Sequence, residues 1–174
     1  MPPKSATYWA EKSGRRGTGG YRDRWLDLYW ETIRRVGTRA MLRRRLAAVP
    51  GQVVRVLDVG CGDGSMTAWV ADLDDRVIAH GCDAYWFDPP LHPRCWFKTP
   101  VDAERVDEHV AWGVDVVTVF GVLECVADWR AALASVARCA PTLILVEDLR
   151  WMAPAYQRGL SYKTAIEWGA FQDA

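Results

Sequence analysis

A β-branched run that passes directly into a glycine-rich loop is the feature that most constrains this chain. The run, residues 53–59, has the continuous apolar character of a strand buried in a parallel sheet. Gly60, Gly62 and Gly64 follow it, and their lack of side chains allows a tight turn and a close approach of a ligand to the backbone. In parallel α/β sheets the first strand-to-helix turn lies at the edge where ligands bind. We therefore expect a ligand site in this loop.

Strand-like and helix-like segments alternate through the rest of the chain. This alternation predicts a Rossmann-like α/β sandwich of three layers, with a mainly parallel sheet of about five strands and right-handed crossovers. Besides the first strand, we expect strands at residues 76–82, 95–98, 114–120 and 142–146, and helices at 65–71, 103–111 and 129–139.

Residues 1–50 form an N-terminal extension of different character. Glycines among basic residues predict a flexible arm over residues 1–20. Apolar residues at mostly helical spacings then predict one or two amphipathic helices over 21–48, with Gly37 as the expected break. We expect this extension to form a lid or the substrate side of a single globular unit whose ligand-binding domain covers residues 51–174.

Charge is divided between the two parts, although the net charge is zero. Residues 1–50 carry 12 Lys and Arg against 4 Asp and Glu, whereas residues 51–174 carry 10 against 18. The arginine-rich stretch 15–45 is able to hold nucleic acid through its phosphates; a solvated helix face or an arm docked on the acidic body is the simpler explanation. No apolar run approaches the ~20 residues of a membrane helix, and the N-terminus lacks a secretory signal. We expect a cytoplasmic protein without membrane contact.

The five cysteines contain no Cys-x-x-Cys pair, and their odd number argues against a disulfide framework. A metal site is one hypothesis for His80, Cys82, His92 and Cys95, which supply two imidazoles and two thiolates within a short stretch. The alternative is that His80 and Cys82 share one face of a strand, where cysteine acts as a small buried hydrophobe. We favour reduced thiols and expect no metal.

Three details narrow the ligand of the loop. Ser65 stands where a dinucleotide fingerprint needs its third glycine, and no Gly-Lys-Ser/Thr sequence of a phosphate loop follows. Asp58, just before the loop, would repel a pyrophosphate but attract a cationic amino group, directly or through water. Asp83 ends the second strand, where an acidic side chain accepts hydrogen bonds from ribose hydroxyls. Ribose together with a cationic amino acid describes S-adenosylmethionine.

The motif Val56-Leu57-Asp58-Val59-Gly60-Cys61-Gly62-Asp63-Gly64 resembles the first motif of class I S-adenosylmethionine-dependent methyltransferases. Asp83 resembles the ribose-binding acid of the second motif, and residues 101–103 resemble the segment whose acid faces the adenine amino group. Residues 114–126 and 143–147 resemble the fourth-strand and fifth-strand motifs, so the resemblance spans roughly residues 53–148. It implies S-adenosylmethionine as cofactor and S-adenosylhomocysteine as product, held by Asp58, Gly60, Cys61, Gly62, Gly64, Asp83, Ala84, Asp102, Ala103, Phe120 and Leu123.

The chain also departs from the family pattern. Many relatives have His where Cys125 stands, and only 26 residues follow Asp148, where the family continues with a helix and an antiparallel strand pair. We therefore expect that strand pair to be missing, and residues 153–174 to be mostly helical. An uncovered fifth strand would be an exposed sheet edge. We expect the C-terminal helix, or a second subunit in a homodimer, to cover it.

The resemblance implies methyl transfer by in-line displacement, for which holding the acceptor close to the methyl supplies most of the acceleration. Glu124, just after the fourth strand, is the leading candidate for a catalytic polar group; a helix-start carboxylate is the alternative reading. A small-molecule acceptor is favoured. A nucleic-acid methyltransferase that grips through residues 15–45, and a non-catalytic binding module of the same fold, remain alternatives.

Overall fold

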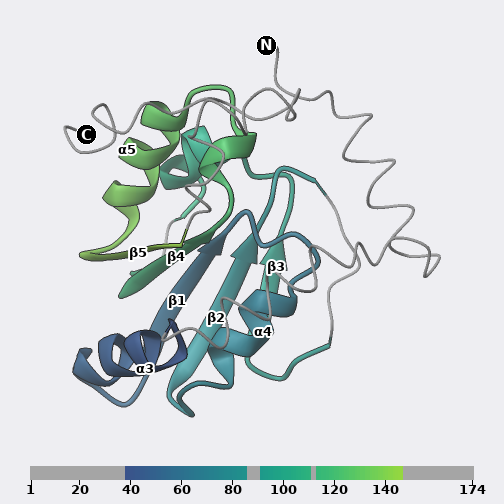
Figure 1. Cartoon of the computed structure of the whole chain (residues 1–174). Coiled ribbons are helices and arrows are strands. Elements are labelled where there is room, and N and C mark those ends of the chain that lie inside the picture. The colour runs from purple at the N-terminus through teal and green to yellow at the C-terminus, as the bar shows by residue number, and fades with distance from the viewer. Residues whose placement is uncertain (1–37, 86–90, 111–112, 147–174) are drawn as a thin grey trace, which may run out of the picture.

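A parallel sheet of five strands forms the centre of the computed structural model, which describes residues 38–85, 91–110 and 113–146 (Figure 1). Every neighbouring pair of strands runs in the same direction. The spatial order is β3-β2-β1-β4-β5. The strands are β1 (Val54–Val59), β2 (Val77–Cys82), β3 (Cys95–Lys98), β4 (Val116–Phe120) and β5 (Thr142–Val146).

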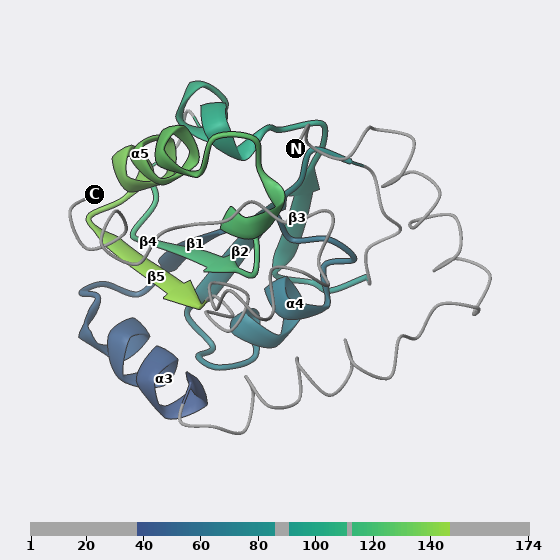
Figure 2. The ribbon, with the colours of Figure 1, turned by 45° about the horizontal axis from the view of Figure 1, so that its top comes forward.

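Helices cover both faces of this sheet, so the expected three layers are confirmed (Figure 2). The described helices are α3 (Thr38–Ala48), α4 (Ser65–Ala71) and α5 (Trp129–Cys139), together with the 3-10 turns η1 (Ala103–Glu108) and η2 (Leu123–Cys125). α3 and α4 pack on one face and η1 and α5 on the other. Successive strand residues point to opposite faces, and the two cores accordingly take alternate residues of β1.

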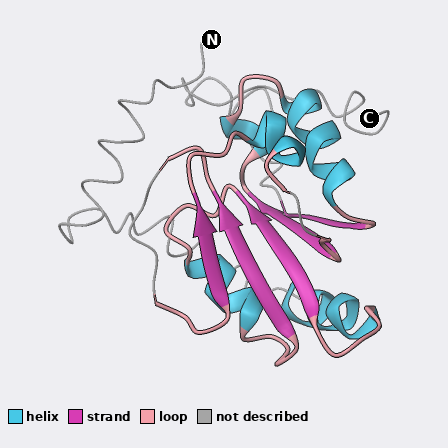
Figure 3. Cartoon of the chain, turned by 180° about the vertical axis from the view of Figure 1, so that it is seen from behind, coloured by secondary structure: helices cyan, strands magenta, loops and turns pink. Residues whose placement is uncertain are grey.

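The strand order places a reversal point beside the first strand. The chain runs from β1 outward to β2 and β3, and then returns to β4 on the other side of β1. The arrowheads of the strands point to one edge of the sheet, as the view from behind shows (Figure 3). Ligands of open α/β sheets bind outside the carboxyl ends of the strands at such a reversal point. The carboxyl edge between β1 and β4 is therefore the place for a site.

Four expected elements are confirmed to the residue: β3, β5, α4 and α5 have the predicted bounds. The other strands begin one or two residues later than predicted. For β4 the reason is local, because the Asp115 carboxylate accepts the Arg55 N–H at 2.7 Å and the strand pairing with β1 starts from Val116.

The helix expected over residues 103–111 was wrong in kind and length. The structure has instead η1, which ends at Glu108 and contains a kink where Arg105 takes φ −137°. The Asp102 side chain accepts the Glu104 N–H and fixes the start of this short turn. The kink at Arg105 interrupts the series of backbone hydrogen bonds that an α-helix would need.

The predicted elements at the two ends fall outside the described residues. These are the basic arm, the first part of the helical stretch 21–48, and the helix over residues 153–174. α3 begins at Thr38, directly after the predicted break at Gly37. Among the helices that the structure describes, none has the length and apolar character needed to cross a membrane.

Candidate functional site

The glycine loop leaves β1 at the reversal point in a conformation that requires glycine. Gly60, Gly62 and Gly64 have φ of 70°, 54° and 77°, which are strained for side-chain-bearing residues. A Cβ atom at Gly60 would lie 2.4 Å from Val122 Cγ2, beyond the end of β4. The loop therefore closes against the β4 side of the reversal point so tightly that no side chain fits at Gly60.

Backbone hydrogen bonds fix the other side of the loop to β2. The N–H groups of Gly60 and Cys61 both donate to the Cys82 carbonyl, at 2.7 and 3.0 Å. The Gly64 N–H donates back to the Cys61 carbonyl at 2.9 Å and closes the turn before α4. The loop is thus a preformed, rigid turn over the carboxyl ends of β1 and β2.

Asp83, directly after β2, turns its carboxylate toward the loop. Oδ2 accepts the Gly62 N–H at 2.9 Å, and Oδ1 accepts the Tyr85 N–H at 3.0 Å. The side chain is partly buried, whereas the neighbouring Ala84 is exposed. The structure thus brings the acid of the second motif against the glycine loop, as its predicted role requires.

Asp102 lies beside Asp83 because the two segments are joined by their backbones. The Val101 N–H donates to the Asp83 carbonyl at 2.8 Å. Asp102 is exposed, and its Oδ1 accepts the Glu104 N–H at 3.0 Å, while Ala103, the first residue of η1, is buried. Both predicted ligand-binding acids therefore lie at the carboxyl edge, on the β2–β3 side of the loop.

The residues predicted after β4 complete this edge. Phe120 and Leu123 are both buried, Phe120 in the core under α3 and α4 and Leu123 in the core under α5. Between them Gly121 has φ 66°, which sets the turn into η2. Glu124 lies in η2, but its side chain is outside the described part of the structure, so its catalytic role stays a prediction.

Asp58 lies beneath the loop, inside the protein. It is 1% exposed, and its two carboxylate oxygens accept hydrogen bonds from Thr67 Oγ1 at 2.6 Å and Thr118 Oγ1 at 2.9 Å. Burial raises the pKa of Asp58 to about 6, although both hydroxyls act in the opposite direction. Its predicted contact with an amino group stays a prediction. Sequence reasoning missed both threonines; the only signal was a hydroxyl at position 118 within an otherwise apolar strand.

The Cys61 side chain faces the protein interior. Its sulfur lies against Gly81, since a Cβ atom there would be 2.9 Å away. Burial raises the pKa of the Cys61 thiol, and of the Cys82 thiol beside it, far above the ordinary value. Both thiols are therefore neutral packing groups, and the backbone of Cys61 takes part in the turn.

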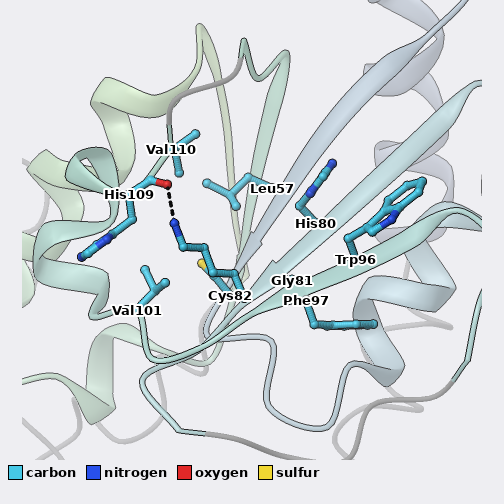
Figure 4. Close-up of a pocket in the computed structure, with 10 residues that line it drawn as sticks. Leu57, His80, Gly81, Cys82, Trp96, Phe97, Val101, His109 and Val110 are labelled. Carbon is cyan, nitrogen blue, oxygen red and sulfur yellow. Dashed lines mark hydrogen bonds between the residues drawn. The ribbon is translucent and has the colours of Figure 1, made fainter.

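A small cavity lies away from the loop, on the α5 face of β2 and β3 (Figure 4). His80 and Trp96, which are among its lining residues, stack with their ring centroids 5.4 Å apart. Its volume of about 80 Å³ is well below the ~300 Å³ of small-molecule sites. It is lined by Leu57, His80, Gly81, Cys82, Trp96, Phe97, Lys98, Val101, His109 and Val110.

The four residues weighed as metal ligands do not converge. His92 Nδ1 lies 3.2 Å from Cys95 Sγ, and its Nε2 lies 3.1 Å from Asp72 Oδ1. His80 is instead stacked on Trp96, and Cys82 is buried in the core under α5. Within residues 38–85, 91–110 and 113–146, no three side chains form a group able to hold a metal ion.

Solved structures with the same fold are methyltransferases. The plantazolicin methyltransferase BpumL, in complex with S-adenosylhomocysteine, has a TM-score of 0.63 at 14% identity, with 95% of this chain and 69% of that chain covered. Its counterpart BamL, also with S-adenosylhomocysteine, has a TM-score of 0.61 at 13% identity, with coverage of 86% and 63%.

A third neighbour is the magnesium protoporphyrin IX methyltransferase of Synechocystis PCC 6803 with bound S-adenosylhomocysteine, at a TM-score of 0.56 and 18% identity. That match covers 95% of this chain and 85% of the neighbour. The chain thus spans less than two thirds of the BamL chain and more of the other two.

Family membership rests on a match over most of the sequence. No curated protein sequence matches the chain. A family model described as a methyltransferase domain matches residues 29–169, which include every element of the sheet and the whole glycine loop. The chain belongs to this methyltransferase domain family, with the class I Rossmann-like fold.

Proposed function

We propose that this protein binds S-adenosylmethionine in the glycine loop and transfers its methyl group to a small-molecule acceptor. The observation that carries the proposal is the joining of Asp83 to Gly62 at the reversal point of the sheet. This contact joins the acid expected to bind ribose to the glycine turn, and both lie at the reversal point of the sheet. The S-adenosylhomocysteine bound to the neighbouring methyltransferases supports the same cofactor.

The charges around the loop fit this cofactor and disfavour a phosphate-bearing one. Asp58, Asp83 and Asp102 surround the loop, and carboxylates attract a cationic amino acid but repel a pyrophosphate. Each carboxylate oxygen has two lone pairs. Asp83 Oδ2 is therefore able to keep the Gly62 N–H while it accepts a ribose hydroxyl.

The cofactor, when bound, supplies a methyl group on a positively charged sulfur, which becomes a neutral thioether as the acceptor takes the methyl carbon. The chain's task is to bind, orient and keep water away. The preformed turn fixes the position of the ligand, and the buried Phe120 and Leu123 make the end of β4 rigid. We assign Glu124 the role of orienting the acceptor or accepting its proton when the acceptor is a hydroxyl.

The small-molecule acceptor is supported by the neighbours, which are described as methyltransferases of plantazolicin and of magnesium protoporphyrin IX.

Two measurements test the proposal: binding of S-adenosylhomocysteine tests the cofactor site, and turnover tests methyl transfer. A cofactor that binds the native state must raise the melting temperature, so S-adenosylhomocysteine should do so, and NAD⁺ at the same concentration should not. Release of S-adenosylhomocysteine in the presence of small-molecule acceptors would establish catalysis. Binding without turnover on any acceptor class would favour the non-catalytic module instead.

A nucleic-acid acceptor is the second candidate, favoured by the surface of α3. Four exposed arginines crowd this 11-residue helix, which contains no acidic residue: Arg39, Arg43, Arg44 and Arg45. The carboxyl end of α3 lies near the start of β2, because Arg76 Nη2 donates to the Leu46 carbonyl at 3.0 Å. This surface therefore lies toward the edge of the sheet opposite the glycine loop (Figure 1), where it would hold an RNA at a distance from the methyl group.

Salt dependence decides this second candidate. Binding through phosphates weakens steeply with salt, so a labelled RNA should bind the wild type at low salt and lose affinity as salt rises. Replacement of Arg43 and Arg44 by Gln should reduce the slope, while Arg55→Gln on β1 serves as the control. Absent or salt-independent RNA binding would leave the small-molecule proposal alone.

We also propose a homodimer that covers the β5 edge. Within the described residues β5 pairs with β4 alone, and sheet edges are commonly covered or paired. Light scattering coupled to size-exclusion chromatography should then give twice the chain mass of 19.6 kDa. A monomer at all concentrations would refute the dimer.

A further inference from the structure

We propose that Thr67 and Thr118 are positioning residues of the cofactor site, whose two hydroxyls hold Asp58 as a fixed anion beneath the glycine loop for the cofactor's cationic amino group. The inference rests on the proposed function. It assigns a role to two side chains that act through Asp58.

The three side chains come from the three elements that frame the loop. Asp58 is the next-to-last residue of β1, Thr67 lies on α4 just after the loop, and Thr118 lies on β4 across the reversal point. All three are buried, with exposed fractions of 1%, 0% and 0%. Through the two hydroxyls, Asp58 therefore links β1 to α4, which follows the loop, and to β4, on the other side of the reversal point.

Both hydroxyls are placed to donate to the ionised carboxyl. Thr67 Oγ1 donates to Oδ2 at 2.6 Å and Thr118 Oγ1 donates to Oδ1 at 2.9 Å, so each oxygen receives one hydrogen. A protonated carboxyl would itself donate a hydrogen bond from one of these oxygens. The threonine hydroxyl that faces this oxygen would then have to accept instead of donate. Hydrogen bonds to the charged form lower a carboxyl pKa, which opposes the effect of burial.

No cation within the described residues compensates this charge. Asp83, a second acid, is the titratable group whose charge acts on Asp58, and the pKa values of the Cys61, Cys82 and Cys95 thiols are raised by burial and by the charge of Asp58. An unpaired buried carboxylate is costly unless a positive partner arrives. The geometry thus prepares a negative charge at the base of the loop that a cationic ligand would complete.

The experiment measures the affinity for S-adenosylhomocysteine, which carries the amino group, between pH 5 and 9 by calorimetry. The wild type should bind more weakly below pH about 6, where Asp58 takes up a proton. Thr67→Val and Thr118→Val remove one donor each at nearly constant volume, so the inflection should move upward. At pH 7 the affinity should fall roughly three- to tenfold and recover by pH 9.

Three controls separate positioning from folding. Thr67→Ser and Thr118→Ser keep the hydroxyl and should restore the wild-type pH profile. Asp58→Asn should bind weakly without an inflection. The affinity for 5′-methylthioadenosine, which lacks the amino acid, should be the same in the wild type and in every variant that folds.

Each outcome has a distinct meaning. If the wild type binds S-adenosylhomocysteine but the valine variants keep its inflection, the positioning role is refuted while the proposed function stands. An equal loss of both ligands would also refute it, because the threonines would then only support the fold. If the wild type binds neither ligand at any pH, the proposed function fails, and the amino-group role fails with it.

Discussion

The backbone N–H of Gly62 and the carboxylate of Asp83 are joined by a hydrogen bond of 2.9 Å, although 21 residues separate them in the chain. The contact links the turn after β1 to the end of β2, so the acid expected to bind ribose also holds the loop in shape. Hydrogen bonds to an ionised acceptor are the stronger ones. The loop is therefore arranged before any ligand arrives, which lowers the entropic cost of binding.

Replacement of Asp83 should separate these two roles. Asp83→Asn keeps an acceptor for the Gly62 N–H but loses the charge-assisted bonds to ribose hydroxyls, so we expect the affinity for S-adenosylhomocysteine to fall about tenfold. Asp83→Ala should lower affinity further and also lower the melting temperature. Calorimetry and thermal unfolding check the two effects. Asp75→Asn, on an exposed turn, is the control, and equal affinities for Asp83→Asn and the wild type would contradict the ribose role.

Gly60 offers a test of the close approach between the loop and the residues after β4. Gly60→Ala would place a methyl 2.4 Å from Val122 Cγ2 in a backbone with φ 70°. Overpacking of this kind costs about 1–3 kcal/mol, to which the strain of a positive φ adds. We expect a lower urea midpoint and loss of S-adenosylhomocysteine binding.

Gly113 is the matched control for that substitution. A Cβ atom at Gly113 meets no atom within 4 Å. Gly113→Ala should leave both the midpoint and the affinity near their wild-type values. A Gly60→Ala variant that binds as well as Gly113→Ala would show that the turn is not the ligand cradle.

The carboxyl edge could be predicted because local patterns determine it. Apolar runs that end in Gly or Asp mark where each strand stops, and parallel strands place all those stops at one edge. The partners of Asp58 could not be predicted, because Thr118 lies 60 residues away and its contact depends on the register of β1 against β4. The sequence predicted a contact of Asp58 with an amino group, directly or through water, and it did not indicate that the side chain is buried against Thr67 of α4.

Arg76 should be a main support of α3, although it lies in the turn before β2. Its Nη1 donates to the carbonyls of Val49 and Gly51 at 3.0 and 3.1 Å, and its Nη2 to that of Leu46 at 3.0 Å. The Leu46 carbonyl lies in the last turn of α3, where it also accepts the Val49 N–H at 3.1 Å, and the carbonyls of Val49 and Gly51 follow the helix. We expect Arg76→Ala, and to a lesser degree Arg76→Lys, to lower the melting temperature by a few degrees.

The same substitution should leave cofactor affinity unchanged at temperatures well below unfolding, because the contact lies at the opposite edge of the sheet from the glycine loop. Arg39→Ala on the exposed face of α3 is the control for a lost surface charge. An equal effect of Arg39→Ala and Arg76→Ala on the melting temperature would contradict the capping role.

Asp107 should make stability depend on pH in the acid range. Arg138 Nε donates to its Oδ2 at 2.7 Å, and the Ser135 hydroxyl donates to its Oδ1. The Arg138 contact, followed by the Ser135 contact, lowers the pKa of Asp107 to about 2 from about 3.8 in an unfolded chain. A depressed carboxyl pKa stabilises the folded state fully above pH about 4, and that stabilisation disappears as the pH falls toward 2.

The measurement is the urea midpoint of the wild type and of Asp107→Asn between pH 7 and 2. The wild type should have the higher midpoint at pH 7, and the difference should shrink between pH about 4 and 2, because the carboxyl of the unfolded chain gains its proton first and the native carboxyl gains its own only near pH 2. Asp58, whose raised pKa acts with the opposite sign between pH about 4 and 6, is present in both proteins and cancels. Asp75→Asn should show no such convergence. A constant gap between the wild type and Asp107→Asn down to pH 2 would mean that Arg138 and Ser135 do not stabilise the carboxylate.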